Sequence, residues 1–127
     1  MYRQIALFCA FICSSTHLFA HEMVPAYPKF GPSYMSDVSK TTVKMFNKRR
    51  DVEWYEIGVF DQDRNSIPFV SKYKIMQLQY LDHATVDIYV RNNDLDRVVY
   101  ICSRSKLRKE QATKTLVASV ICSKVKQ

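Results

Sequence analysis

The sequence predicts an all-β domain built as a sandwich of about seven antiparallel strands. Runs rich in β-branched and aromatic residues recur along the chain, and polar clusters separate them roughly every 8–12 residues. Several runs alternate apolar and polar residues, as residues 86–90 do, which places one set of side chains on a core face. No helical period is sustained after residue 20. These features favour two packed sheets.

The expected strands share this composition and are separated by short polar connections. They cover residues 41–47, 52–60, 67–70, 74–81, 84–91, 97–102 and 114–126. Residues 21–40 instead carry three prolines and a glycine, so they predict an extended lead-in or an edge strand, because proline lacks the backbone donor. The length of 127 residues suits one domain.

Residues 1–20 have the order of a secretory signal peptide. A basic residue, Arg3, precedes a nine-residue apolar run over residues 5–13, and a polar segment then ends at Ala20. The run is shorter than the ~18–20 residues that span a bilayer. We therefore expect cleavage after Ala20, no transmembrane segment, and a mature domain of residues 21–127 in the periplasm or outside the cell.

Cleavage would leave two cysteines, Cys102 and Cys122, in an oxidising compartment, where an even pair favours a disulfide. A hairpin centred on Ala112 places Cys102 opposite Cys122 and Arg104 opposite Val120. Facing residues in such a hairpin lie close enough for a disulfide. A structural zinc site would need four ligands, and the mature chain offers two cysteines and two histidines.

The sequence carries no catalytic motif. It lacks the HExxH, GxSxG and phosphate-loop patterns, and its closely spaced aspartates fall in expected turns. We therefore expect a non-enzymatic protein without a cofactor. The net charge of +7 includes basic clusters at residues 48–50 and 104–109. Aromatic residues do not interleave with these cations and we expect a secreted protein, so we expect no nucleic acid. The clusters are either solubilising loop charges or a site for an anionic partner.

Two other functions fit the same composition. Cleavage after Ala20 would make His21 the N-terminal residue, and its α-amine and imidazole, with His83 as a second imidazole, would then suit copper. A secreted sandwich of this size also suits a virion or surface-structure subunit that assembles with its own copies.

The order of the strands resembles the first domain of the periplasmic pilus chaperones of the chaperone–usher pathway. The similarity is one of spacing and pattern over about residues 29–126. The sequence departs from the family around its Asp-Arg pair, where the flanking Pro and Glu-Ser are absent. The segments that carry the resemblance are residues 43–47, 54–60, 68–70, 75–78, 86–90, the pair Asp96-Arg97 before residues 98–100, and residues 116–121.

The resemblance implies a seven-stranded immunoglobulin-like sandwich whose last strand is offered to a pilus or surface subunit by β-strand addition. The donor residues would be Leu116, Ala118 and Val120, or Val117, Ser119 and Ile121, depending on which face is inward. In this family two basic residues also hold the C-terminal carboxylate of the subunit. By position, Lys29 is the candidate near the N-terminus, and Lys124 or Lys126 is the candidate on the last strand.

Overall fold

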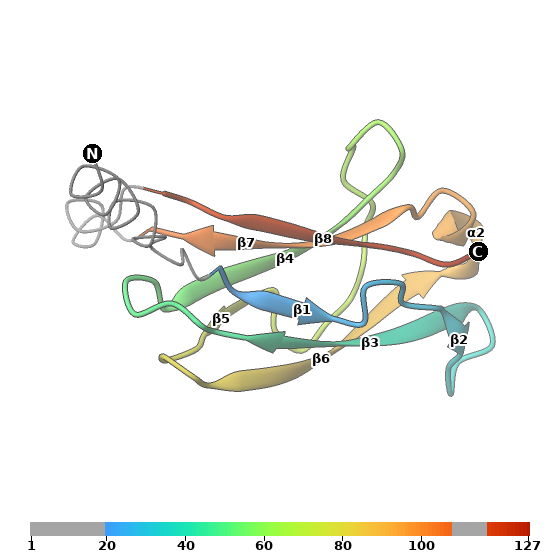
Figure 1. Cartoon of the computed structure of the whole chain (residues 1–127). Coiled ribbons are helices and arrows are strands. Elements are labelled where there is room, and N and C mark those ends of the chain that lie inside the picture. Colours follow the sequence, from blue (N-terminus) through green and yellow to red (C-terminus); the bar gives the residue numbers. More distant parts are fainter. Residues whose placement is uncertain (1–19, 108–116) are drawn as a thin grey trace, which may run out of the picture.

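The computed structural model describes residues 20–107 and 117–127, and it contains two antiparallel four-stranded sheets packed face to face (Figure 1). In the first sheet, β1 and β2 pair with one edge of β3, and β6 pairs with the other. The second sheet has the order β5-β4-β7-β8. The strands are β1 (Glu22–Val24), β2 (Gly31–Pro32), β3 (Val38–Phe46), β4 (Trp54–Phe60), β5 (Ile75–Gln77), β6 (His83–Arg91), β7 (Tyr100–Lys106) and β8 (Val120–Lys124).

The all-β sandwich predicted from the sequence is confirmed. One helical turn, α2 (Asn92–Leu95), connects β6 to the stretch before β7. Across the described ranges, no helix has the length and apolar character needed to cross a membrane.

The core lies between the two sheets and follows the two-residue period of the sequence. In β4 the buried and half-buried residues alternate without a break, and β6 repeats the pattern along most of its length. Burial removes these apolar side chains from water, which is the main force that joins the sheets. Fully buried members include Val43, Met45, Tyr55, Val59, Ile88 and Ile101.

A buried amide closes one end of this core and fixes the connection from β3 to β4. The Nδ2 group of Asn47 donates hydrogen bonds to the carbonyls of Val52 and Leu78, each at 2.8 Å. Its Oδ1 accepts from the Tyr55 hydroxyl at 2.6 Å and from the backbone N–H of Arg49 at 2.8 Å. Every polar atom of the amide is thus satisfied, as burial requires.

The ends of several strands are shifted, as in β7 over residues 100–106 in place of 97–102, and three further differences are larger. In residues 67–70 only Val70 makes an isolated bridge, with Tyr89, and Pro68 lacks the N–H that a ladder needs. The expected strand over residues 74–81 shortens to β5, and Leu81 adopts a positive φ of 68°. The lead-in supplies the two short strands β1 and β2.

Candidate partner-binding edge of β8

The hairpin of β7 and β8 has the register that the sequence predicted. Cys102 lies opposite Cys122 and Arg104 lies opposite Val120, and a disulfide joins the two cysteines. The Cα atoms of the two cysteines are 4.0 Å apart. In the described part of the second sheet β8 is the last strand, so only its β7 side is paired within the sheet (Figure 1).

Two hydrogen bonds define which backbone groups of β8 point outward. The N–H of Ser105 donates to the carbonyl of Ser119 at 2.9 Å, and the N–H of Val125 donates to the carbonyl of Val99 at 2.8 Å. Hydrogen-bonded and non-hydrogen-bonded pairs alternate in an antiparallel ladder. Odd-numbered residues of β8 therefore bond to β7, and the N–H and C=O groups of Val120, Cys122 and Lys124 point away from it.

The C-terminal end of this outer edge is occupied by the chain that follows β1. The N–H of Lys124 donates to the carbonyl of Ala26 at 3.0 Å, and the N–H of Lys126 donates to that of Pro28 at 2.8 Å. Within the described ranges, no such partner is found for the outward groups of Val120 and Cys122. The part of the edge without backbone partners therefore begins at Cys122 and extends toward the start of β8, and β1 lies close to it without pairing with it. We call this the open part of the edge.

The side chains before and within β8 separate into two faces. Ala118 and Val120 are exposed, Val120 by 53%. Ile121 packs against the core, and Ser119 bonds to buried groups between the sheets. Of the two alternative donor sets, the one with Ala118 and Val120 is thus the outward one. Leu116, the first member of that set, lies outside the described residues. Arg108 and Lys109 of the basic cluster also lie outside them. Val117 is also exposed.

The candidate basic residues meet at the far end of the same edge. Lys29 and Lys126 form an isolated parallel β-bridge, so segments about a hundred residues apart bring two lysines side by side. Both are exposed, as is Lys124. In the described part of the chain, no carboxylate lies within ion-pair distance of these three.

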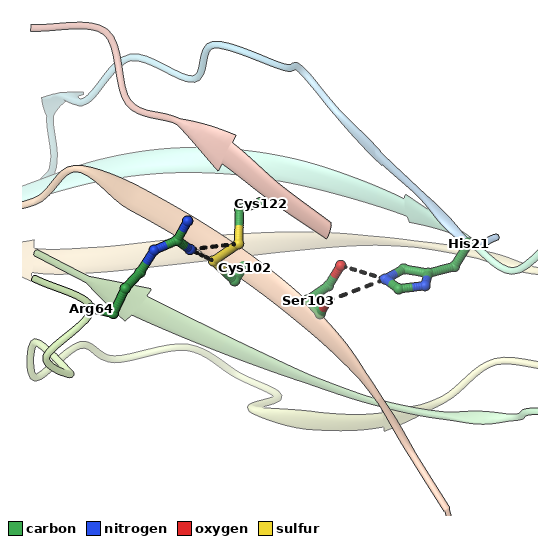
Figure 2. The surroundings of a disulfide bond; sticks show 5 residues. All are labelled: His21, Arg64, Cys102, Ser103 and Cys122. Carbon is green, nitrogen blue, oxygen red and sulfur yellow. Dashed lines mark hydrogen bonds between the residues drawn. A yellow bond between two sulfur atoms is a disulfide. The ribbon is translucent and has the colours of Figure 1, made fainter. Parts of the chain in front are cut away.

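His21 lies between the sheets and contacts the inner side of the hairpin (Figure 2). Its Nδ1 is 2.9 Å from the Ser119 hydroxyl and its Nε2 is 2.7 Å from the Ser103 hydroxyl. Burial lowers the pKa of His21 most, the hydrogen bond with the Ser103 backbone raises it, and the nearby Arg49 charge lowers it. His21 is therefore neutral at pH 7 and links β8 to β7.

The two histidines proposed for copper have different surroundings. Both ring nitrogens of His21 are engaged by serines, whereas His83 is exposed on β6 and stacks on Phe46 at a ring distance of 5.3 Å. Among the residues described, no group of three or more His, Cys, Asp or Glu side chains could hold a metal ion. The copper hypothesis stays a prediction that this geometry does not support.

Arg49 is a site residue that the sequence did not reveal. Its side chain is only 8% exposed, and its Nε and Nη2 donate to the two carboxylate oxygens of Asp51 at 2.9 and 2.6 Å. Nη2 also donates to the carbonyl of Val117 at 2.8 Å, and Nη1 to the Ser119 hydroxyl at 3.2 Å. The guanidinium thus fixes the segment that leads into β8. The one sequence feature that could have indicated this role is Asp51, a carboxylate two residues after Arg49 that can accept its hydrogen bonds.

No protein-family model and no curated protein sequence matches this chain. Among solved structures it is similar to the E. coli chaperone DraB, with a TM-score of 0.62 and 15% sequence identity. The match covers 84% of this chain and 53% of DraB, so the chain spans about half the length of that chaperone. This likeness shows a shared fold.

Proposed function

We propose that this protein is a chaperone-like binding module that accepts an extended segment of another protein along the open edge of β8. The observation that carries the proposal is the pair of outward-facing residues, Val120 and Cys122, at the end of a sheet. A sheet edge with unpaired N–H and C=O groups is a template for a further strand. The fold shared with the chaperone DraB supports the same class of function.

The open edge is held in place before any partner arrives. The disulfide ties β8 to β7, Arg49 binds the carbonyl of Val117, and His21 links Ser119 to Ser103. A strand that is already ordered loses little conformational freedom on binding, which leaves more of the hydrogen-bond energy for affinity. This geometry suits a module that donates a preformed strand.

We further propose that the lysines at the far end of the edge bind the C-terminal carboxylate of the partner. Lys29 and Lys126 lie side by side, and Lys124 is two residues away on β8. Val120 and Lys126 are six residues apart, which is about 20 Å of extended chain. Residues 26–28 pair with this end of the edge, so a partner chain would leave the β8 ladder after Cys122 and pass over them to bring its carboxylate to the lysines.

The domain would act by binding alone, outside the cytoplasm, and would need no cofactor. The disulfide fits an oxidising compartment such as the periplasm. Partners of this kind include pilus or other surface-structure subunits that lack a strand of their own. A second copy of this chain is the alternative occupant, and light scattering over a range of concentrations separates the two.

The test of strand addition is Val120→Pro. Proline removes an N–H that points away from β7, so the β7–β8 ladder keeps its hydrogen bonds while the outer edge loses a donor. Ile75→Pro is the matched control, because Ile57 donates to the carbonyl of Lys74, which places the N–H of Ile75 at the outer side of β5. Both variants are tested for partners that co-purify with the exported protein.

We expect Val120→Pro to lose its partner while Ile75→Pro keeps it, with similar melting temperatures for the two variants. Hydrogen exchange on the complex should show new protection at Val120 and Cys122. Retention of the partner by Val120→Pro with unchanged affinity would show that the edge of β8 is not the binding site.

A further inference from the structure

The outer face of the second sheet has a cavity of about 650 Å³ beside the open part of β8. Its floor includes Gly58 and Cys102, which face each other on β4 and β7, and the disulfide joins Cys102 to Cys122 on β8. Glycine has no side chain and the cysteine side chain is short, so little side-chain volume fills the cavity above them. The Phe60 ring lies over Gly58, where a Cβ would be 2.6 Å from two of the ring carbons.

Arg64 reaches over this floor from the loop between β4 and β5 (Figure 2). Its Nη1 lies 3.2 Å from the sulfur of Cys122 and 3.6 Å from that of Cys102. The guanidinium also lies 4.1 Å from the centre of the Tyr100 ring. A tight turn presents this side chain, because Asp61 accepts hydrogen bonds from the backbone N–H groups of residues 63 and 65.

The lining of the cavity has an excess of positive charge. Arg64, Lys74 and Arg104 contribute three cations, and in the described ranges none of them is within ion-pair distance of a carboxylate. The one acidic lining residue, Glu56, is already paired with Lys106 at 2.8 Å. The remaining walls include phenylalanines and Val120, so the cavity suits carboxylates on an otherwise apolar chain.

The cations are placed to meet side chains of a strand added to β8. Such a strand would lie one spacing beyond β8, and thus about 10 Å from β7. A glutamate opposite Val120 could meet Arg104, which is in the same row, since the two side chains together span that distance. A glutamate opposite Cys122 could meet Arg64, which already contacts the Cys122 sulfur. The two positions are two residues apart on one face of the added strand.

We propose that this cavity is a specificity site that accepts two acidic side chains, two residues apart, from the strand that pairs with β8. The inference rests on the proposed strand addition and states which strands the edge prefers. Strand pairing uses backbone groups that every sequence has, so it supplies affinity but no specificity for one partner. Charged side chains beside the edge would supply the specificity.

The test uses two fluorescent peptides of about ten residues, a common length for a long strand. Both alternate valine with a polar residue, and at two successive polar positions one carries Glu and the other Gln. Anisotropy titrations compare the purified protein with Arg64→Gln/Arg104→Gln and with the control Lys44→Gln/Arg50→Gln. The control removes the same charge from positions that do not line the cavity.

We expect the Glu peptide to bind the unmodified protein and the control about fivefold to tenfold more tightly than the Gln peptide. The preference should vanish in Arg64→Gln/Arg104→Gln and return in Arg64→Lys/Arg104→Lys, which keeps both charges. The Gln peptide should bind every variant equally. Because exposed charges are screened, about 0.5 M salt should reduce the preference.

The outcomes separate this inference from the function on which it rests. Equal binding of the two peptides, with both lost in Val120→Pro, would leave strand addition standing and overturn the specificity site. A preference for Glu that persists in Val120→Pro would show anion binding without strand addition, and would also overturn it. If neither peptide binds, strand addition fails and the specificity site fails with it.

Discussion

The two edge strands of the second sheet, β5 and β8, are built in opposite ways. β5 is three residues long and lies beside two exposed lysines, Lys72 and Lys74. A short strand flanked by lysines is a common means of preventing edge-to-edge pairing. β8 is five residues long, has no charged residue before Lys124, and is fixed to its neighbours along its length. The sheet thus protects one edge and keeps the other available.

The anchors of β8 come from parts of the chain that are distant in sequence. The disulfide joins it to β7, Arg49 holds the segment that leads into it, and residues 25–28 cover its last third. Figure 1 shows β1 and β8 on the same side of the sandwich, although they lie near opposite ends of the described chain. By contrast, β5 pairs only with β4 in the described sheet. The following predictions remove the anchors of β8 one at a time.

Removing the disulfide should have the largest effect on the difference between the edges. The two cysteines are 20 residues apart, and closure of such a loop stabilises a fold by about 3 kcal/mol in the chain-entropy model. We expect Cys102→Ala/Cys122→Ala to lose about that much free energy of unfolding in urea. Hydrogen exchange should increase most in β8 and little in β5. Equal increases in both strands would show that the disulfide stabilises the whole domain and not this edge.

Arg49→Ala should have the next largest effect. The substitution removes hydrogen bonds to Asp51, to the carbonyl of Val117 and to Ser119. The Asp51 side chain is 41% exposed, so solvent screens its charge when Arg49 is removed, and we expect a loss of about 2 kcal/mol. Arg50→Ala, next to it, is the control. Arg50 is exposed over the Tyr80 ring, and its removal should cost less than about 0.5 kcal/mol.

Partner binding distinguishes a positioning role of Arg49 from a general one. Arg49→Ala should weaken binding of the Gln peptide, whereas a core change that destabilises the fold at least as much, such as Ile88→Ala, should leave that affinity unchanged. If both variants weaken binding to the same extent, Arg49 acts only through overall stability.

The features of β8 that could be predicted from the sequence are local ones. The register of the β7–β8 hairpin followed from two cysteines placed symmetrically about a polar segment. The two-residue period divided the donor residues into two alternative sets, and the structure shows that the set with Val120 is the exposed one. In each case the residues used for the prediction lie on one hairpin. Period and spacing can predict such contacts because the residues in contact are near one another in sequence.

The anchors of β8 could not be predicted because they depend on contacts between distant segments. His21 meets Ser119 across 98 residues, and Arg49 meets the same serine across 70. In the sequence Arg49 is the middle residue of a basic cluster, for which an exposed position is the usual outcome. Its burial became evident only when the fold placed Asp51 and the start of β8 around it. The cavity beside β8 was missed likewise, because Arg64 reaches it from a loop.

The smallest expected effect concerns the protonation of His21. Burial keeps the folded-state pKa of this histidine below its usual value near 6.5. Between that value and the folded-state pKa the unfolded chain binds the additional proton, so stability falls as the pH is lowered through this range. One group contributes at most about 1.4 kcal/mol per pH unit. We expect His21→Gln to abolish this slope and His83→Gln, at an exposed position, to retain it.

Urea denaturation at several pH values between 7.5 and 5 measures that slope for the three proteins. Asp61, Asp87 and Asp94 have lowered pKa values, so their contributions are lost at a lower pH and do not obscure the range of His21. Burial and the nearby Arg49 charge both oppose protonation of the ring, so the neutral form is the one that links Ser119 to Ser103 at pH 7. A slope that survives His21→Gln would mean that another group titrates, and that the edge of β8 is held without the neutral histidine.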